Sequence, residues 1–365
     1  MKPRFPNTFS ALLAGILGLG AVPAMAQSSS VTIYGIYDIG ITRVSNIGGH
    51  AVTRLDDSIA QGNRLGFRGS EDLGAGLRAF FNLEMGFAGD TGALRQGGLG
   101  FGRASIVGLA HKDWGELSLG RQFDQMNASL IRFSPNVTAG VYSATVGDAD
   151  RVAGNWLNNM VTYKTPVWGG LQLAGQYSFK EDGTSSTNSG RAYSVGATYS
   201  NGPFAAGAAL TDIRGYTIAP GSLFGVSSFL GAPTAGSIRL DKYRTAGIGA
   251  GYTLGKFTLS GLITRTRFEN AGASQHLTHF AIPLVYRPTE QWLLEAGFAQ
   301  SRMEYSRWRN FSLMADYFLS KRTDVYVSAN IEKASGEGTS AVIFTLPTSS
   351  SNRQTVLRMG IRHRF

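Results

Sequence analysis

Polar and apolar residues alternate along the last fourteen residues, 352–365. From Thr355 onward, one parity is mostly apolar and the other carries three arginines. A strand of a soluble sandwich can alternate in this way, but chains seldom stop on such a strand with an aromatic carboxy terminus and no tail. A strand that has to pair with another strand so that the sheet keeps no free edge is expected to end with such a pattern. The pattern predicts the closing strand of a membrane barrel, with lipid on one side and water on the other.

The same period of two recurs from Val31 onward, with almost no helical periodicity. In residues 31–42, 63–71 and 77–85, apolar side chains dominate one parity, while the other includes arginines, acids and amides. Arginines on that second parity indicate an interior that is solvated rather than packed. Pro283 interrupts a later segment and lacks an amide donor, so it predicts a bulge there.

The connections between these segments alternate between short and long, as is typical of a barrel with tight turns at one rim and loops at the other. Short turns are predicted near residues 72–76, 112–115, 168–169, 201–202, 254–255, 288–289 and 321–322. Longer links are predicted near residues 45–57, 89–98, 124–156, 181–190, 213–241, 269–275, 303–307 and 336–351. The sequence therefore predicts an all-β fold, a 16-stranded antiparallel transmembrane β-barrel with both ends on the short-turn side.

The beginning of the chain predicts export. Residues 1–26 combine a basic start, an apolar run and the small-x-small sequence Ala24-Met25-Ala26, which together are typical of a signal peptide. The apolar run is too short for a comfortable transmembrane helix. Residues 27–365 are therefore interpreted as the barrel domain of an exported chain.

Tryptophans are predicted to mark two membrane interfaces. Trp114, Trp168 and Trp292 lie near short turns, whereas Trp156 and Trp308 lie near the longer links. Tryptophans scattered through a soluble core would show no such separation. The placement therefore predicts one aromatic belt at each rim.

Composition excludes several kinds of site. The chain has no cysteine, which excludes a disulfide framework and a thiolate metal site. Of its five histidines only His276 and His279 are close, and three residues apart in a strand they point to opposite faces. No metal, cofactor or catalytic motif is expected. Without residues 1–26 the net charge falls from +10 to +8, and this charge is spread along the strands, so no nucleic-acid partner is expected.

Four ordered motifs resemble the Gram-negative general porins, especially the betaproteobacterial branch that includes Bordetella, Burkholderia and Neisseria-like members. They are Ser-Val-Thr-Ile-Tyr-Gly at 30–35, the glycine- and arginine-rich stretch at 63–74, Leu-Gly-Arg-Gln-Phe-Asp at 119–124, and the terminal 360–365. The resemblance spans essentially the whole mature chain. It implies a homotrimer of outer-membrane barrels among membrane lipids and lipopolysaccharide. It also implies that Phe365 is read by the barrel insertion machinery.

The resemblance further implies that the third link, residues 124–156, folds inward and narrows each pore. A diffusion pore needs fixed charges at such a waist, because low-dielectric walls focus the field there. The predicted basic residues of the constriction are Arg64, Arg78, Arg121 and Arg151, and the predicted acidic residues are Asp38, Glu84, Asp124, Asp148 and Asp150. Each of them could instead be an ordinary solvated residue of the wall.

Two details of this set stay open at the level of sequence. Arg121 follows the outward residues Leu117 and Leu119, so a bend after Gly120 has to turn it inward. The third link lacks the Pro-Glu-Phe-Gly-Gly motif of enteric porins, which leaves open which of its acids line the pore.

The sequence thus predicts an outer-membrane porin for passive diffusion of small hydrophilic solutes and ions. The surplus of inward arginines predicts an anion preference. The alternatives are a substrate-selective channel, with saturable block by one ligand class, or a barrel adhesin or enzyme, which would need a catalytic cluster at the rim. The apolar link at 211–241 could cover the pore mouth, contact a neighbour or pack locally.

Overall fold

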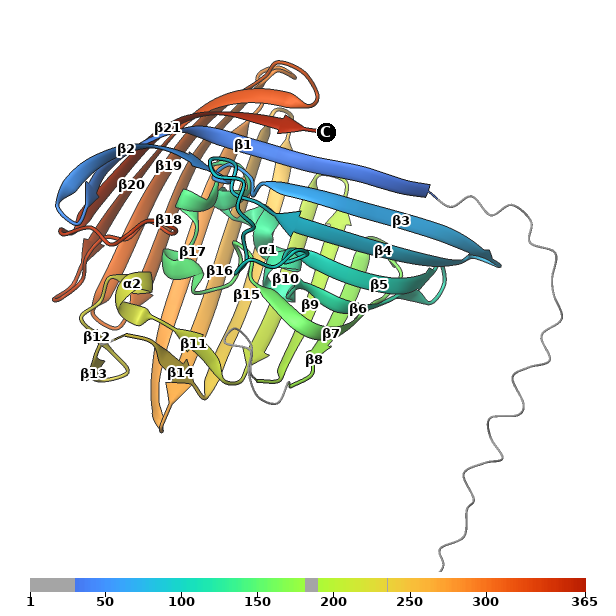
Figure 1. The fold of residues 1–365 in the computed structure, drawn as a ribbon, viewed down its shortest axis with the longest axis horizontal. Helices are drawn as coiled ribbons and strands as arrows, with labels where there is room; N and C mark the ends of the chain where they lie inside the picture. The colour runs from blue at the N-terminus through green and yellow to red at the C-terminus, as the bar shows by residue number, and fades with distance from the viewer. Residues whose placement is uncertain (1–29, 181–189, 235) are drawn as a thin grey trace, which may run out of the picture.

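The computed structural model describes residues 30–180, 190–234 and 236–365. The predicted signal peptide, residues 1–26, and nearly all of the predicted link at 181–190 lie outside these described residues. One large antiparallel sheet closes on itself, because β1 (Ser30–Ile47) pairs with β21 (Arg353–Arg364) (Figure 1). The second barrel strand is made of two pieces that lie end to end along β1, namely β2 (His50–Asp57) and β3 (Arg64–Gly74).

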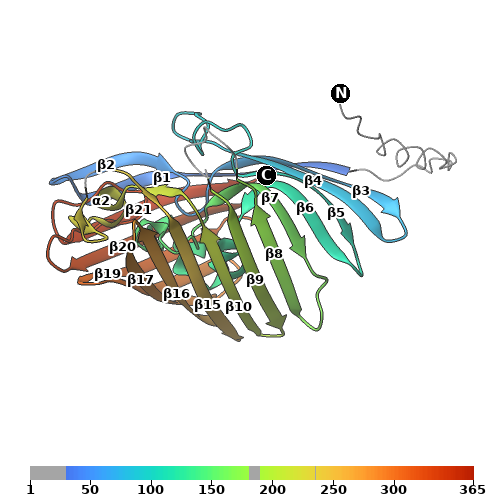
Figure 2. The same cartoon turned by 90° about the horizontal axis from the view of Figure 1, so that it is seen from below.

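The remaining barrel strands each pair with their neighbours in chain order (Figure 2). They are β4 (Leu77–Gly86), β5 (Ala104–His111), β6 (Gly115–Phe123), β7 (Trp156–Lys164), β8 (Leu171–Ser178), β9 (Ala192–Asn201), β10 (Phe204–Ile213), β15 (Lys242–Leu254), β16 (Phe257–Asn270), β17 (Ala273–Tyr286), β18 (Trp292–Met303), β19 (Ser306–Phe318) and β20 (Thr323–Ser335). Counting β2 and β3 as one strand, the predicted 16-stranded antiparallel barrel is confirmed. Within the described residues, no helix is long and apolar enough to cross a membrane.

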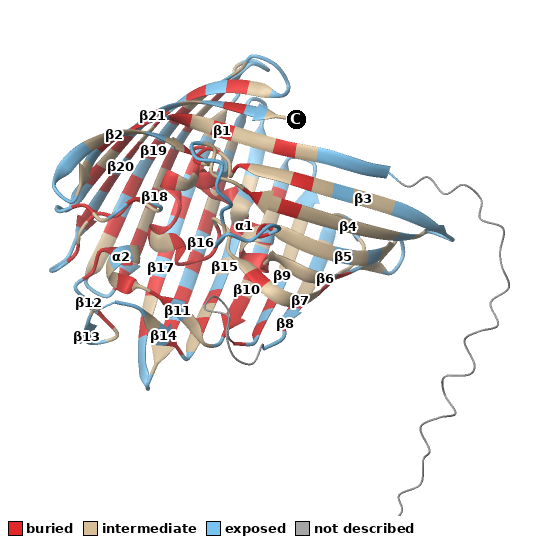
Figure 3. Cartoon of the chain, in the orientation of Figure 1, coloured by how far each residue is buried: buried red, intermediate tan, exposed pale blue. Residues whose placement is uncertain are grey.

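Side chains alternate between the outside and the inside of the barrel. In β19, Leu313 is 58% exposed, whereas the next residue, Met314, is only 4% exposed. Figure 3 shows this alternation of buried and exposed residues along the strands of the second half of the chain. The period of two in the sequence therefore corresponds to the two faces of the barrel wall.

Four local predictions are wrong. The predicted longer links at 269–275 and 303–307 are two-residue turns, at 271–272 and 304–305. The predicted link at 45–57 is instead a hairpin of β1 and β2, whose turn consists of Gly48 and Gly49 with φ of 59° and 101°. A Gly-Gly pair suits a two-residue turn that needs positive φ, and it is a hairpin signal rather than a loop signal. Pro283 forms no bulge, because Leu259 pairs with Leu284 and Leu262 pairs with Ala281, which leaves two residues between them on each strand.

The predicted aromatic belts are correct at only one rim. Trp114, Trp168 and Trp292 are exposed at or next to short turns. At the loop rim, however, Trp308 is 2% exposed and belongs to an interior cluster, and Trp156 lines an internal cavity. Proximity to a loop does not determine which face a strand residue occupies, whereas its parity does.

The apolar link between β10 and β15 packs inside the loop-side mouth. It contains β11 (Tyr216–Ile218), α2 (Pro220–Phe224), β12 (Ser228–Phe229), β13 (Ala232–Pro233) and β14 (Ile238–Leu240). The rings of Phe224 and Phe229 lie 5.8 and 5.3 Å from that of Phe268 on β16, and all three residues are buried. The link therefore packs locally against the inner side of the barrel wall.

Candidate pore constriction

The segment between β6 and β7 lies inside the barrel. It contains α1 (Gln125–Leu130) and the short 3-10 helices Ile131–Phe133, Pro135–Val137, Val141–Ser143 and Val146–Asp148. The helix α1 contacts β9, β10 and β15, and the later turns contact β16 to β19. This segment, residues 124–155, is called the third loop below.

Apolar packing fixes the third loop to one side of the inner wall. Met126, Leu130 and Phe133 are buried against a cluster that includes Ala205 and Ala209 of β10. Gly249 of β15 allows this close approach, because a Cβ there would lie 2.5 Å from the Phe133 ring. The loop therefore narrows the lumen from the side of β9 to β19.

Charged residues inside the third loop hold it in shape. Asp124 caps α1 by accepting from the backbone N–H groups of Met126 and Asn127, at 3.1 and 3.3 Å. Its other oxygen is 2.5 Å from Nε of Arg151, and both side chains are essentially unexposed. An ion pair of this kind is costly to break, because either charge would be left buried alone.

The remaining acids of the loop are buried as well. Asp150 accepts hydrogen bonds from Thr145 and from Thr264 on β16, at 2.7 and 3.0 Å. Asp148 accepts from the backbone N–H of Ala153 and from Asn155, both at 2.8 Å. Burial, and secondly the neighbouring Asp150, raise the pKa of Asp148 well above its usual range.

A cavity of about 480 Å³ separates the third loop from the opposite wall. The wall of β2 to β5 and the links beside it contribute the charged lining residues Arg54, Arg64, Arg95, Arg103, Asp56 and Asp57. The third loop contributes the uncharged lining residues Asn127, Ile131, Asn136, Val137, Val141, Ala153 and Gly154. Among the lining residues, four arginines therefore outnumber two aspartates on one side of this passage, and the other side carries no charge.

Glu84 of β4 is the shared partner of two wall arginines. Its carboxylate is 2.6 Å from Nε of Arg103 and 4.0 Å from Nη1 of Arg64, and it accepts a hydrogen bond of 2.9 Å from Tyr34. Glu84 is only 8% exposed, whereas the Arg64 side chain is 23% exposed. The acid therefore stays behind the arginines and does not face the passage directly.

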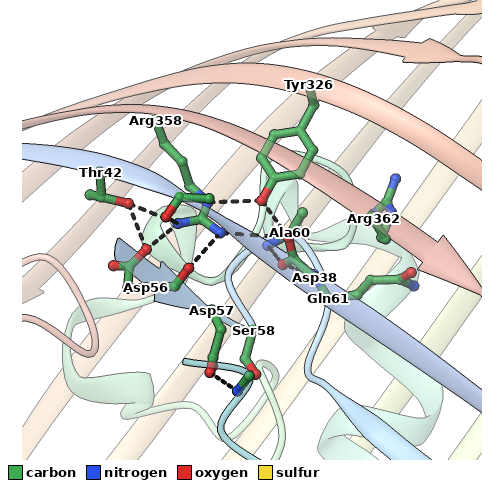
Figure 4. Close-up of polar contacts among 12 residues, drawn as sticks. Asp38, Thr42, Asp56, Asp57, Ser58, Ala60, Gln61, Tyr326, Arg358 and Arg362 are labelled. Atoms are coloured by element: carbon green, nitrogen blue, oxygen red, sulfur yellow. Dashed lines mark hydrogen bonds and ion pairs between the residues drawn. The ribbon is translucent and has the colours of Figure 1, made fainter. Parts of the chain in front are cut away.

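Asp38 of β1 holds the segment between β2 and β3 in place. It accepts from the backbone N–H groups of Ala60 and Gln61, at 2.7 and 3.1 Å. It also accepts a 2.5 Å hydrogen bond from Tyr326 and lies 3.5 Å from Nη2 of Arg358 (Figure 4). Because the Asp38 side chain is fully buried, it positions the lining residues without lining the passage itself.

The same network reaches the passage through Asp56. Arg358 donates to Asp56, and Tyr142 of the third loop donates to the same carboxylate at 2.6 Å. Arg54 lies 3.2 Å from Asp56 and keeps 35% of its side chain exposed. Asp56 thus joins the third loop, the basic wall and the barrel seam in one set of contacts.

The other predicted arginines occupy different places. Gly120, with φ of 121°, lies at the shift of the β6–β7 register, as the predicted bend requires. The Arg121 guanidinium then lies 5.9 Å from the Trp156 ring, beside that of Arg103 at 5.3 Å. Arg78 lies next to the short turn after β3, over the Phe80 ring, and it is exposed there.

Sequence reasoning missed the lining residues Arg54, Arg95 and Arg103. Arg54 lies in the stretch interpreted as a loop, although Arg54 and Asp56 alternate there with Thr53 and Leu55 in the pattern of a strand. Arg95 lies in the link before β5 and pairs with Asp57, a long-range contact without a local signal.

The carboxy terminus closes the sheet. The backbone N–H of Gly35 donates to the carbonyl of Phe365 at 2.9 Å, and the N–H of Phe365 donates back at 3.1 Å. Phe365 is 47% exposed on the outer face. Across the described residues, no group of three or more histidine, aspartate or glutamate side chains is placed to hold a metal ion.

Comparison with known proteins points to one family. A sequence profile described as Gram-negative porin matches residues 10–336. The chain is 30% identical over 372 residues to outer membrane porin protein 32 of Delftia acidovorans, which covers 97% of this chain and 98% of that protein. It is 34% identical over 218 residues to an outer membrane porin protein of Bordetella pertussis, which covers 53% of this chain and 56% of the other.

Solved structures show the same fold. The anion-selective porin from Comamonas acidovorans superposes with a TM-score of 0.77 at 25% identity, over 93% of this chain and 100% of that one. OmpT of Vibrio cholerae, in its trimer form, superposes with a TM-score of 0.69 at 14% identity, over 93% and 100%. At that lower identity the likeness is one of fold alone.

Proposed function

The chain belongs to the Gram-negative porin family, and on this premise we propose that its outer-membrane channel prefers anions. Family membership places the protein among passive diffusion channels and not among enzymes. The preference itself is supported by one observation above all. One wall of the passage carries four arginines and two aspartates, whereas the third-loop residues that line the passage opposite them are uncharged.

The physical basis is a positive electrostatic field in the passage. Arg54, Arg64 and Arg95 keep 35%, 23% and 42% of their side chains exposed, and guanidinium groups remain charged at any physiological pH. A narrow passage with low-dielectric walls focuses such a field and raises the local concentration of the opposite ion. The relative from Comamonas acidovorans, which is described as anion-selective, supports this proposal by analogy.

We propose that Arg54, Arg64, Arg95 and Arg103 form the basic side of the constriction. Of the residues predicted from sequence, Arg64 lines the cavity and Arg121 supports it through the Trp156 ring. The third loop supplies the narrowing, and its charged residues Asp124, Asp148, Asp150 and Arg151 hold its shape. Asp38 and Glu84 position the wall, whereas Arg78 acts at most at the short-turn mouth.

Assembly and targeting complete the proposal. Residues 1–26 act as a signal peptide, as their sequence pattern supports. The mature barrels form a homotrimer in contact with membrane lipids and lipopolysaccharide, and the insertion machinery recognises Phe365. The family resemblance supports the homotrimer, the contact with lipids and lipopolysaccharide, and the recognition of Phe365.

The reversal potential under a salt gradient in a planar bilayer tests the anion preference. The wild-type channel should favour anions, and the double variant Arg54→Gln/Arg64→Gln should lower the anion-to-cation permeability ratio by on the order of tenfold. The variant Arg287→Gln/Arg322→Gln is the matched control, because it removes two exposed arginines near the short-turn rim. Clear cation selectivity of the wild type would overturn the proposal.

A further inference from the structure

The passage is lined by apolar side chains as well as by charged ones. Six large apolar or aromatic residues line the cavity beside the third loop, and they are called the apolar strip below: Phe123, Ile131, Val137, Val141, Trp156 and Phe344. Val137 is 43% exposed, and the other five are partly exposed. Apolar surface that stays open to water in a narrow passage is surface that an apolar part of a solute can cover.

Aromatic rings form half of the apolar strip. The Phe123 and Trp156 rings stack with their centroids 4.8 Å apart, where β6 ends and β7 begins. Gly154 leaves room for this stack, because a Cβ there would lie 2.7 Å from the Phe123 ring. Phe344 comes from the link between β20 and β21. Rings of this kind favour an aromatic solute, because aromatic pairs gain from stacked and edge-on contacts.

Arg64 is the lining arginine that the protein neutralises least. Its nearest carboxylate is that of Glu84, at 4.0 Å, and the same carboxylate is 2.6 Å from Arg103. The other three lining arginines each lie within 3.2 Å of a carboxylate oxygen. Arg64 donates from Nε to the carbonyl of Gly62 at 2.9 Å, and its two terminal nitrogens donate to no other described residue. Two unused nitrogens of a planar guanidinium match the two oxygens of a carboxylate.

The basic wall and the apolar strip meet at Arg103. Its guanidinium lies 5.3 Å from the centroid of the Trp156 ring. Its Nε lies 2.6 Å from Glu84, which is also the carboxylate nearest to Arg64. Arg64 and Trp156 therefore lie beside the same guanidinium, and one small solute can contact both.

We infer that the passage binds aryl carboxylates, with the carboxylate on Arg64 and the ring against the apolar strip. This inference rests on the proposed function, because it uses the arginines that attract anions into the passage. The cavity of about 480 Å³ has the size of a small-molecule site, which typically measures about 300–1,000 Å³. The site has to be weak, because a solute that crosses a channel must also leave it.

The distribution of charge selects this class over other anions. An inorganic anion would contact the arginines and leave the apolar strip uncovered. A long dicarboxylate would place its second charge against uncharged side chains, at a cost in desolvation. A flat acid with one carboxylate at one end matches both the basic wall and the apolar strip.

Block of the chloride current through the purified full chain in a planar bilayer tests this site. The probes are benzoate, acetate, benzyl alcohol and terephthalate, each titrated at the same ionic strength and neutral pH. Benzoate should reduce the current saturably, with at least a tenfold lower half-blocking concentration than acetate. Cover of about 60 Å² of ring surface is sufficient for that factor. Benzyl alcohol, which lacks the charge, and terephthalate, which carries a second one, should both block more weakly than benzoate.

Three variants separate the two parts of the site. Arg64→Gln should raise the half-blocking concentration of benzoate about tenfold, because it removes a charge-assisted hydrogen bond. Phe344→Gln keeps every charge and should raise it roughly threefold to tenfold, because it removes a ring contact. Val137→Gln changes a side chain that is already 43% exposed and therefore does not endanger folding, and it should raise the value roughly threefold.

Tyr305→Gln is the matched control. Tyr305 is 90% exposed at the turn between β18 and β19, so this variant loses an aromatic ring outside the passage and should be blocked like the wild type. Equal block by benzoate and acetate, or stronger block by terephthalate than by benzoate, would overturn the inference. Wild-type benzoate block in both Phe344→Gln and Val137→Gln would overturn it as well.

The outcome is separable from that of the selectivity experiment. The reversal potential in potassium chloride alone decides the anion preference, whereas the ratio of benzoate to acetate block decides the present inference. Cation selectivity together with a benzoate block that depends on Phe344 would overturn only the proposed function. Anion preference together with equal block by benzoate and acetate would overturn only the inference about aryl carboxylates.

Discussion

The two sides of the passage use charge in opposite ways. The wall of β2 to β5 leaves arginines exposed to water, with Arg54 and Arg64 the clearest cases. The third loop contains two arginines and three aspartates. Arg132 is exposed and donates to Ser200, whereas Arg151 and the three acids are buried and hydrogen-bonded. Charge on the wall is available to a passing solute, whereas the buried charge in the loop maintains the shape of the loop.

The difference shows why counting charged residues is a poor guide to selectivity. The predicted constriction set contains five acids, and all five are less than 9% exposed. Residues that compensate each other inside the protein contribute little field to the lumen. The selectivity of the passage therefore depends on which charged side chains stay exposed to the lumen.

The largest expected effect comes from breaking the ion pair inside the third loop. Arg151→Met leaves Asp124 buried without its partner and should destabilise the barrel by about 3–5 kcal/mol. Arg132→Met removes an exposed arginine of the same loop and should cost less than about 0.5 kcal/mol. Guanidinium unfolding in detergent, followed by circular dichroism, measures both. Equal midpoints for the two variants would contradict a structural role for the pair.

A smaller effect is expected from pH. The raised pKa of Asp148 means that the native state holds a proton that the unfolded chain releases near pH 4. Stability from this group is therefore fully present below that pH and is lost as pH rises toward the native pKa, by at most about 1.4 kcal/mol per pH unit. Asp148→Asn should flatten this part of the stability profile. An unchanged slope in the variant would assign the pH dependence to other groups.

The smallest effect is expected from giving the third loop an exposed charge, which until then only the opposite wall presents to the passage. Val137 of the third loop lines the passage and is 43% exposed. Val137→Glu places an uncompensated carboxylate opposite the arginines and should lower the anion-to-cation permeability ratio by roughly threefold to fivefold, equivalent to about 1 kcal/mol. Val137→Gln has nearly the same size without the charge and should leave the ratio unchanged. If both variants behaved alike, the effect would be steric.

The fold could be predicted from sequence because the barrel wall has a strict period. Leu313 and Met314 are both apolar, but the surrounding alternation assigns them to opposite faces. The errors occurred where the period gives no information. The Gly48-Gly49 pair looks like loop composition, and the register at Pro283 is set by its neighbours.

The site was harder to predict because its geometry depends on contacts between distant segments. Parity correctly placed Arg64 on the lumen side, but it could not show that Glu84 lies behind the arginines. The acids of the third loop look available in the sequence, and only the folded loop shows that Asp150 is held by Thr145 and Thr264. Burial is a tertiary property that a pattern within one strand does not contain.

The pairing of β1 with β21 has a consequence for biogenesis. Arg358 and Gly40 meet across this seam although 318 residues separate them. During translation the first strand therefore remains without one of its two neighbours until almost everything after it has been made. An unpaired edge of this kind is prone to aggregation. A holding chaperone, or a template that temporarily occupies the edge, has to protect the nascent polypeptide during that interval.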